Sequence, residues 1–367
     1  MKTVLVFAGT RPEIIKMAPL IRELRSRQSA VRTHFVFTGQ HVEIALPFLK
    51  FFEIEPDTRL QLMNPNQSLG QLTSTAFLQF DEFLKQQSSV AALVQGDTTT
   101  AFAAALSCYY QHIPIGHVEA GLRTQNLNEP FPEEANRRMI TRLASWNYAP
   151  TIKAGETLKN EQVNPESILV TGNTGIDALL WTAAQNFEPK SDELQKLKNQ
   201  KLVLITLHRR ENLEDRLEHI LKAFVKLADQ FKEIQFVMPV HPNPKVVVAA
   251  KKYLSGLANV HLVSPLDYPD FVWVMKKAEL ILSDSGGIQE EAPSLLKPVL
   301  VLRENTERPE AVEYGTSIMV GVNSESIVST AVSFLTGNRS IKNRGSKNPY
   351  GDGTASRKIV DHLLAQI

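Results

Sequence analysis

The sequence predicts an α/β protein made of two doubly wound units in tandem, and three observations support this. Short apolar runs alternate with longer amphipathic ones, which is typical of a parallel sheet covered by helices on both faces. The chain has 367 residues, more than one hydrophobic core commonly serves. A charged, lysine-rich stretch near residues 190–201 separates two series of such runs.

The elements are predicted from the period of the apolar residues. In the first series, strands are expected at residues 4–7, 33–37, 90–94 and 115–118, and helices at 18–27, 68–85 and 99–111. In the second, strands are expected at 202–206, 234–240, 260–263, 280–283 and 299–302, and helices at 216–232, 244–255, 271–277 and 287–296. The junction is expected near residues 171–175, and the chain shows no internal repeat.

The composition narrows the class of ligand. Forty basic residues balance thirty-nine acidic ones, so no excess charge is present to hold nucleic acid or an anionic membrane. This favours a small anionic ligand that is met by local groups in a cleft. The single cysteine, Cys108, lies in an apolar helical stretch and is compatible with packing in a reducing compartment.

The first residues do not predict a signal peptide, because the apolar run is short and breaks at Thr10. No stretch approaches the roughly 20 apolar residues that span a bilayer. We therefore expect a soluble protein of the cytoplasm that binds neither nucleic acid nor membrane.

Polar clusters follow six of the predicted strands, at the end where parallel sheets bind ligands. In the first unit they begin at Gly9, Gly96 and Glu119, and in the second at His208, His241 and Ser283. We expect the clusters of the two units to face one another across a cleft.

The turn Ser285-Gly286-Gly287 has the character of a diphosphate site, because free backbone N–H groups at a strand-to-helix turn attract anions. Glu291, further along, is placed to accept hydrogen bonds from ribose. A tight turn that binds nothing and a solvated glutamate are the plainer interpretations. The spacing is neither a Walker loop nor a GxGxxG fingerprint, which argues against ATP or NAD in their usual sites.

Two cations stand where a helix is expected to begin. Arg11 lies on the turn before Pro12, and Lys16 follows about one helical turn later. Because the helix dipole alone disfavours cations there, the pair suits a phosphate or a developing negative charge. The alternative is a surface pair without a role.

Three carboxylates near the same edge, Asp97, Glu119 and Glu133, are candidates for acid and base work, since clustered carboxylates divide such roles. Asp97 could instead be only a helix N-cap, and Glu133 only a first-turn helix charge.

His208 and His241 each end a strand and could contact a diphosphate, and Arg308 could close on a nucleotide. A metal pair is the competing hypothesis for the histidines, but no metal-binding spacing accompanies them, so no metal site is predicted.

Taken together, these residues make the chain resemble the non-hydrolysing UDP-N-acetylglucosamine 2-epimerases over nearly its whole length. The matching stretches are residues 9–13 with Lys16, then 96–100, 117–124, 132–137, 171–173, 208–212, 283–294, 306–312 and 348–353. Many blocks in the right order make the resemblance specific.

The resemblance implies the glycosyltransferase-B architecture, a homodimer, and a final helix at 355–367 that crosses back onto the first domain. The implied domains are a Rossmann-like domain at 1–172 plus 354–367 and a UDP-binding Rossmann-like domain at 173–353. No cofactor is implied. The implied substrate contacts are Arg11, Lys16, Asp97, Glu119, His208, Phe271, Ser285, Gly286, Gly287, Glu291 and Arg308, and the implied acid/base residues are Asp97, Glu119, Glu133 and His208.

The chain departs from the family pattern at three places. Leu266 stands where a glutamine is expected on the uracil side, and Asn128-Glu129-Pro130-Phe131 replaces the more usual Tyr-Ser-Pro-Trp. Val42 replaces a common arginine in a loop where bacterial members often bind a second, activating substrate molecule. The positions that match this second site are Gln40, Glu43, Arg209, Glu211 and His241.

The reaction implied is C2 epimerisation by elimination and re-addition of UDP through 2-acetamidoglucal. Asp97 and Glu133 would transfer the protons in an order left open, Glu119 would orient the sugar, and His208 and Arg11 would stabilise the leaving phosphate. The same chemistry on a modified UDP-2-acetamido sugar, a UDP-sugar glycosyltransferase, a hydrolysing epimerase and a non-catalytic nucleotide-sugar sensor remain alternatives.

Overall fold

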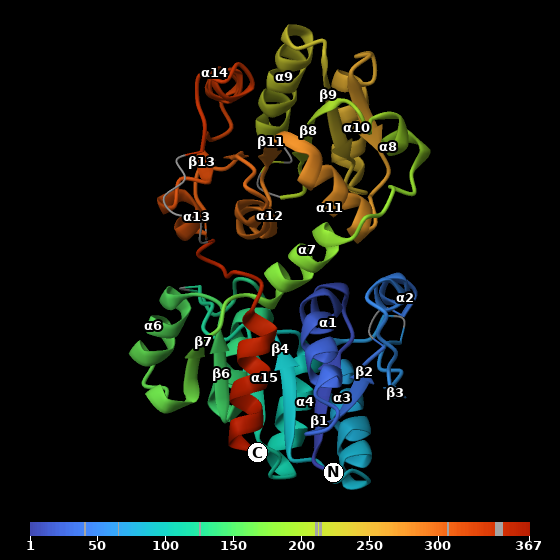
Figure 1. Cartoon of the computed structure of the whole chain (residues 1–367), viewed down its shortest axis with the longest axis vertical. Helices are drawn as coiled ribbons and strands as arrows, with labels where there is room; N and C mark the ends of the chain where they lie inside the picture. The colour runs from blue at the N-terminus through green and yellow to red at the C-terminus, as the bar shows by residue number, and fades with distance from the viewer. Residues whose placement is uncertain are drawn as a thin grey trace. The chain divides into compact units, whose positions relative to one another are not determined.

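The chain divides into two compact units in the computed structural model. The structure describes residues 1–39, 42–64, 66–124, 126–209, 212, 215–306, 308–341 and 348–367, without the side chains of 42–44 and 215. Unit 1 comprises Met1–Ala178 and Tyr350–Ile367, and unit 2 comprises Leu179–Pro349 (Figure 1). Each unit is described by itself.

Unit 1 contains a seven-stranded parallel sheet in the order β3-β2-β1-β4-β5-β6-β7. Its strands are β1 (Thr3–Ala8), β2 (Arg32–Phe37), β3 (Thr58–Arg59), β4 (Ala91–Gln95), β5 (Ile115–Val118), β6 (Trp146–Ala149) and β7 (Ile168–Val170). The central strands are apolar and buried along their length, as expected where helices cover both faces of a sheet.

The helices of unit 1 cover that sheet. They are α1 (Arg11–Ser26), α2 (Val42–Phe51), α3 (Leu69–Lys85), α4 (Thr99–Tyr110), α5 (Glu133–Leu143), α6 (Ile152–Asn160), α7 (Thr174–Ala184), whose last turns belong to unit 2, and α15 (Ala355–Gln366). On one face, Phe80 of α3, Ala104 of α4 and Ile140 of α5 pack against the strands in one buried cluster. Each fully buried phenylalanine or isoleucine contributes about 1.5–3 kcal/mol.

The last helix, α15, completes unit 1. It packs beside α1, and Arg27 pairs with Asp361 at 3.1 Å (Figure 1). The buried carboxylate of Asp177 accepts the backbone N–H groups of Ala355 and Ser356 at 3.2 and 2.8 Å. The N–H groups in the first turn of a helix have no acceptors within the helix, and at α15 this carboxylate provides them.

Unit 2 contains a six-stranded parallel sheet in the order β10-β9-β8-β11-β12-β13. Its strands are β8 (Lys201–Thr206), β9 (Ile234–Pro239), β10 (Val260–Val263), β11 (Ala278–Ser283), β12 (Val299–Val301) and β13 (Ser317–Met319).

Its helices are α8 (Asp192–Lys196), α9 (Asp215–Gln230), α10 (Pro244–Leu254), α11 (Tyr268–Lys277), α12 (Gly286–Glu291), α13 (Pro309–Glu313) and α14 (Ser324–Leu335). Residues of α9, α10 and α14, including Phe224, Val246 and Ile327, form one buried cluster with the strands. The predicted fold class, two Rossmann-like α/β units, is confirmed.

Both sheets reverse their strand order once, and this fixes where ligands are expected. In unit 1 the order reverses between β1 and β4, and in unit 2 between β8 and β11. In open parallel sheets ligands bind beyond the carboxyl ends of the strands at such a reversal. Asp97, His208 and Ser285 stand in three of the turns that follow these strands, and Arg11 is the first residue of α1, directly after the fourth.

Some elements differ from those predicted. Helix α1 begins at Arg11 and not near residue 18, because Thr10 and Glu13 form a capping box around the first turn. The predicted helix 287–296 is α12 followed by a 3₁₀ turn, Ala292–Leu295, which contains Pro293 and ends at Leu296 in the left-handed conformation. Among the described residues, no helix is long and apolar enough to cross a membrane.

Candidate active site

The centre of the unit 1 site is Glu119, directly after β5. Its carboxylate accepts hydrogen bonds from Lys16 at 2.5 and 2.6 Å, from Gln95, and from Asn173 at 3.4 Å. Its backbone φ is 67°, a left-handed conformation that costs a side-chain-bearing residue about 1–3 kcal/mol. The surrounding contacts hold this carboxylate in a fixed place at the edge of the sheet.

Asp97 lies in the neighbouring turn, after β4. Its carboxylate pairs with Arg137 of α5, and its backbone carbonyl accepts the side-chain amide of Asn136 at 2.9 Å. Burial raises the pKa of Asp97, Arg137 opposes this, and the charge of Glu119 adds to it. A Cβ on the intervening Gly96 would lie 4.0 Å from Glu119 Oε2, so the turn and that carboxylate are adjacent. Two predicted carboxylates therefore meet at one edge.

The turn that carries Asp97 is supported by a buried histidine. His117 donates from Nε2 to the carbonyl of Gly96 at 2.8 Å. Burial lowers the pKa of His117 to about 4, so the ring is neutral at ordinary pH. His117 is therefore a support for the turn.

Glu133, the third predicted carboxylate, begins α5 and is half-buried. The same helix supplies the Asn136 and Arg137 that contact Asp97. The structure places Glu133 on the helix that holds Asp97, without a contact between the two carboxylates. Its neighbour Glu134 is fully buried and pairs with Arg137 and Arg138 at 3.3 and 2.7 Å.

The turns after β1 and β4 are joined by Glu13. One carboxylate oxygen accepts the backbone N–H groups of Gly9 and Thr10 at 2.9 and 2.7 Å, and the other accepts the Thr98 hydroxyl at 2.6 Å. Thr98 also caps α4. Arg11, in the first of these turns, lies over the ring of Phe48 at 5.5 Å.

The unit 2 site is organised by Asp284, which lies between β11 and Ser285 and is fully buried. Its carboxylate accepts hydrogen bonds from the backbone N–H groups of His208 and Arg209 and from the amide of Asn212. His208 Nδ1 lies 3.0 Å from Asp284 Oδ1. The turns after β8 and β11 are thereby joined.

A strand-to-helix turn lies where the diphosphate site is predicted. Ser285 precedes α12, and its N–H donates to Ser283 Oγ at 2.9 Å. Arg308 pairs with the carboxylate of Glu290 on this helix. Phe271 is half-buried on α11. Tyr268, also on α11, is buried, and this burial raises its pKa. The charge of Glu291 raises the pKa of Tyr268 further.

The comparisons with known proteins decide what this arrangement belongs to. The family model described as UDP-N-acetylglucosamine 2-epimerase matches residues 22–364. The UDP-N-acetylglucosamine 2-epimerase of Bacillus subtilis is 45% identical over 365 residues, covering 99% of this chain and 95% of that protein. The chain belongs to the UDP-N-acetylglucosamine 2-epimerase family.

Solved structures agree with this assignment. The epimerase from Neisseria meningitidis, bound to UDP-GlcNAc, is 44% identical, with a TM-score of 0.86 over 100% of both chains. The epimerase from Methanocaldococcus jannaschii is 32% identical, with a TM-score of 0.85, again over 100% of both chains. Membership in the epimerase family confirms the resemblance and the predicted enzyme class, an isomerase.

The positions that match the family's second, activating substrate are only partly described. Gln40 and Glu211 lie outside the described residues, as does the side chain of Glu43. The rings of His241 and His208 lie 6.3 Å apart, and Arg209 Nη2 would lie 3.4 Å from a Cβ on Gly286. Arg209 is therefore next to the predicted diphosphate turn, and His241 lies near His208.

Several supporting residues were not predicted individually. In unit 1, the Glu119 carboxylate accepts hydrogen bonds from Gln95 and Asn173, and Glu13 accepts the Thr98 hydroxyl. In unit 2, the Asn212 amide donates to Asp284, and this contact holds the turns. Gln95 and Asp284 each follow an apolar strand directly or end it. A polar residue that interrupts an apolar run at the carboxyl end of a strand is the signal that could have found them.

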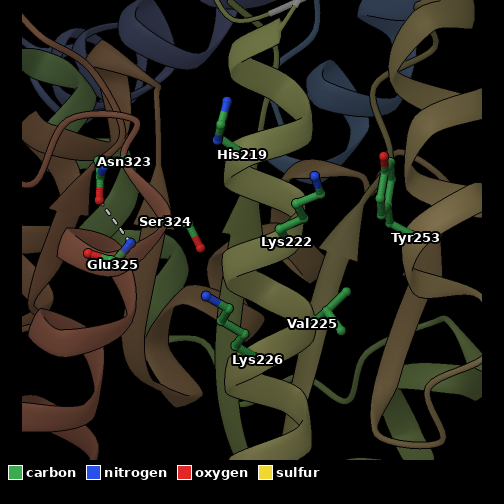
Figure 2. Close-up of a pocket in the computed structure, with 8 residues that line it drawn as sticks. All are labelled: His219, Lys222, Val225, Lys226, Tyr253, Asn323, Ser324 and Glu325. Atoms are coloured by element: carbon green, nitrogen blue, oxygen red, sulfur yellow. Dashed lines mark hydrogen bonds between the residues drawn. The ribbon is translucent and has the colours of Figure 1, made fainter.

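A surface hollow of about 530 Å³ lies elsewhere in unit 2. It is lined by side chains of α9, α10 and the start of α14, among them Lys222, Tyr253 and Ser324 (Figure 2). None of the predicted site residues lines it, so it is separate from the candidate site. Among the described residues, no group of three or more His, Cys, Asp or Glu side chains is arranged to hold a metal ion.

Proposed function

We propose that this chain reversibly converts UDP-N-acetylglucosamine to UDP-N-acetylmannosamine, by eliminating UDP and adding it back through 2-acetamidoglucal. The observation that carries the proposal is the closeness of Asp97 and Glu119, which follow the neighbouring strands β4 and β5 at the carboxyl edge of the unit 1 sheet and interact through their charges. We further propose that unit 1 takes the sugar and that unit 2 takes the UDP.

The chemistry of the substrate requires such a site. The hydrogen on C2 is not alpha to a carbonyl, so it is not acidic enough for direct exchange. In an elimination, a base removes that proton while the C1–O bond breaks and its electron pair leaves with UDP. Protonation of the glycal from the opposite face and return of UDP then give the epimer. Two acid/base groups and a site that stabilises the departing diphosphate are needed.

We assign the two proton transfers to Asp97 and Glu133, in an order left open. The pKa of Asp97 is raised by burial, which brings this carboxylate closer to the range in which it can both take and return a proton. Glu119 is assigned to orient the sugar, and its ion pair with Lys16 holds its carboxylate in place.

The departing UDP is assigned to unit 2. His208, the turn Ser285–Gly287 and Arg308 lie in loops that follow β8, β11 and β12, at the carboxyl edge of the sheet. Arg11 from unit 1 would add a cation. The diphosphate gains negative charge as the C1–O bond breaks, so cations and N–H donors here stabilise the transition state more than the bound substrate.

The reaction can be tested with UDP-N-acetylglucosamine in D2O. The proposal predicts deuterium at C2 with UDP still attached, in both epimers. Release of free sugar with UDP would identify a hydrolysing epimerase. Absence of both products would contradict epimerisation and favour a glycosyltransferase or a sensor. These two are separated by offering sugar acceptors and by measuring UDP binding: a glycosyltransferase transfers the sugar to an acceptor, and a sensor only binds.

We propose that the chain forms a homodimer through unit 1. Apolar side chains on α3 and α4 are exposed together: Leu69 at 44%, Leu78 at 66%, Tyr109 at 54% and Tyr110 at 58%. Phe77 and Tyr110 join the two helices by a ring contact at 5.6 Å. Exposed apolar side chains on neighbouring helices are typical of an interface. A cytoplasmic location is proposed because the single cysteine, Cys108, is compatible with a reducing compartment, and cell fractionation would test it.

Sedimentation tests the dimer. Leu78→Glu is expected to yield monomers at concentrations at which the unchanged protein is dimeric. Ile152→Glu is the matched control, because Ile152 is 71% exposed on α6, away from this patch. A dimer that survives Leu78→Glu would contradict the proposed interface.

A further inference from the structure

The buried Asp284 makes contacts that divide between its two oxygens. Oδ2 accepts the N–H groups of His208 and Arg209 at 3.2 and 3.1 Å and the amide of Asn212 at 3.1 Å. Oδ1 accepts the N–H of His208 at 3.1 Å and lies 3.0 Å from His208 Nδ1. One oxygen thus fixes the loop, and the other also faces the imidazole ring.

The second contact determines which ring nitrogen carries the proton. Burial alone would raise the pKa of Asp284. The net effect is the opposite: this pKa lies below its ordinary value, because His208 contributes a hydrogen bond and a charge and because Arg209 and Asn212 donate further hydrogen bonds. An ionised carboxylate has no proton to donate, so Nδ1 must be the donor. Nε2 is then the nitrogen of His208 that remains for a ligand, and the His208 side chain is 39% exposed.

We propose that Asp284 is a positioning residue that fixes the tautomer and direction of His208, so that Nε2 meets the diphosphate of the UDP-sugar. The inference rests on the proposed function, which assigns the diphosphate to this edge. Nε2 becomes a donor when it takes a proton from solvent; the same carboxylate then stabilises the imidazolium, and Nε2–H donates to a phosphate oxygen as negative charge develops there. Asp284 would not touch the substrate.

The location of Asp284 explains why one residue can do this. It follows β11, and His208 follows β8, the neighbouring strand at the reversal of the sheet. Thr206 and Ser283, at the ends of the same two strands, share a separate hydrogen bond at 2.7 Å. The strands are therefore joined without Asp284, and its contact with Nδ1 is additional to that link.

The test variant is Asp284→Asn. Its single carbonyl oxygen is expected to take the position of Oδ2, where three donors converge, and its NH₂ group then points at Nδ1. A donor at that position favours the tautomer with the proton on Nε2, as happens when the aspartate of a Ser-His-Asp triad is changed to asparagine. We expect kcat to fall about 100-fold or more, with the Kd for UDP changed much less.

The tautomer can be observed directly. In ¹⁵N-histidine-labelled protein, the His208 signals are expected to show a protonated Nδ1 in the unchanged chain and a protonated Nε2 in Asp284→Asn. Adding UDP should shift the Nε2 signal of the unchanged protein most. An unaltered tautomer in the variant would overturn the proposal.

Two comparisons separate positioning from general damage. Thr206→Val removes the neighbouring hydrogen bond between the same strands. It is expected to lower stability while leaving the tautomer and kcat close to those of the unchanged chain. In the double variant His208→Asn with Asp284→Asn, kcat should equal that of His208→Asn alone, because Asp284 acts through His208. Independent, multiplying losses would contradict the proposal.

The outcome also distinguishes the two levels of inference. If the unchanged chain exchanges no deuterium at C2, the proposed function fails, but the ¹⁵N spectrum still tests whether Asp284 sets the tautomer. If exchange occurs and Asp284→Asn retains full kcat, only the positioning role fails.

Discussion

The two edges that carry the predicted site use buried carboxylates in opposite ways. At the unit 1 edge, Asp97 and Glu119 are balanced by side-chain cations, Arg137 and Lys16, and Asp97 remains 27% exposed. At the unit 2 edge, Asp284 is fully buried, and three of its donors come from the loop after β8.

The difference separates reactive carboxylates from positioning ones. A carboxylate surrounded by backbone N–H groups is stabilised in its ionised form and holds its loop in one conformation. A partly exposed carboxylate paired with a cation can exchange that partner for a substrate. The shifts of pKa have opposite signs accordingly, raised at Asp97 and lowered at Asp284.

The largest effect is expected at Asp97. Asp97→Asn removes a group assigned to proton transfer, and deuterium exchange at C2 should fall by about 10²–10⁴-fold, while UDP binding stays nearly intact. Asp81→Asn, a surface change on α3 where Asp81 pairs with Lys85, is the control. Full exchange in Asp97→Asn would remove this residue from the mechanism.

A smaller effect is expected from the pair Lys16–Glu119. Lys16→Gln leaves the Glu119 carboxylate without its cation, and kcat/KM should fall because the sugar site loses its electrostatic balance. A double-mutant cycle with Glu119→Gln should give a coupling of about 0.5–3 kcal/mol. Additive losses would show that the ion pair does not couple the two side chains in catalysis.

Glu13→Gln tests the link between the turns after β1 and β4. The amide provides one acceptor oxygen where the carboxylate serves three donors at two oxygens. The free energy of unfolding should fall by about 1–3 kcal/mol, and deuterium exchange should fall with it, since the turns carry Arg11 and Asp97.

The control for Glu13→Gln lies on the same helix. Glu23→Gln removes an i,i+4 pair with Arg27, which contributes about 0.3–0.5 kcal/mol. If chemical denaturation gave equal losses for both variants, Glu13 would not join the turns.

The smallest effect is the dependence of stability on pH. The pKa of Asp97 is raised on folding, so its contribution is present at low pH and is lost as pH rises from its ordinary value through the raised one. The pKa of Asp284 is lowered, so its contribution is present above its ordinary value and is lost as pH falls through the lowered one.

Thermal unfolding of both asparagine variants across pH checks these signs. As pH rises through the acid range, the unchanged protein should lose stability relative to Asp97→Asn and gain it relative to Asp284→Asn. Two differences with the same slope would contradict the contrast between the two edges.

The sequence predicts the central strands well because they are continuously apolar. The predicted strand 115–118 coincides with β5, and the predicted strand 202–206 lies within β8. The edge strands β7 and β13 are short and partly exposed, so their residues carry little apolar signal, and they were not predicted.

For the site, turn chemistry located the reactive candidates but not their supports. Asp97 and Glu119 stand beside glycines at strand ends, which marked them. Their partners Arg137 and Asn173 are distant in sequence and meet them only through the arrangement of the strands. Single-sequence patterns describe local geometry, so contacts across 40 or 54 positions could not be predicted from them.

The division of unit 1 into two segments has a consequence for biosynthesis. Residues 179–349 leave the ribosome before residues 350–367, so unit 2 can fold while unit 1 still lacks α15. Until then the face of α1 that packs against α15 is open to solvent. Premature termination near residue 350 would therefore yield a finished unit 2 and an incomplete unit 1 that is prone to chaperone binding.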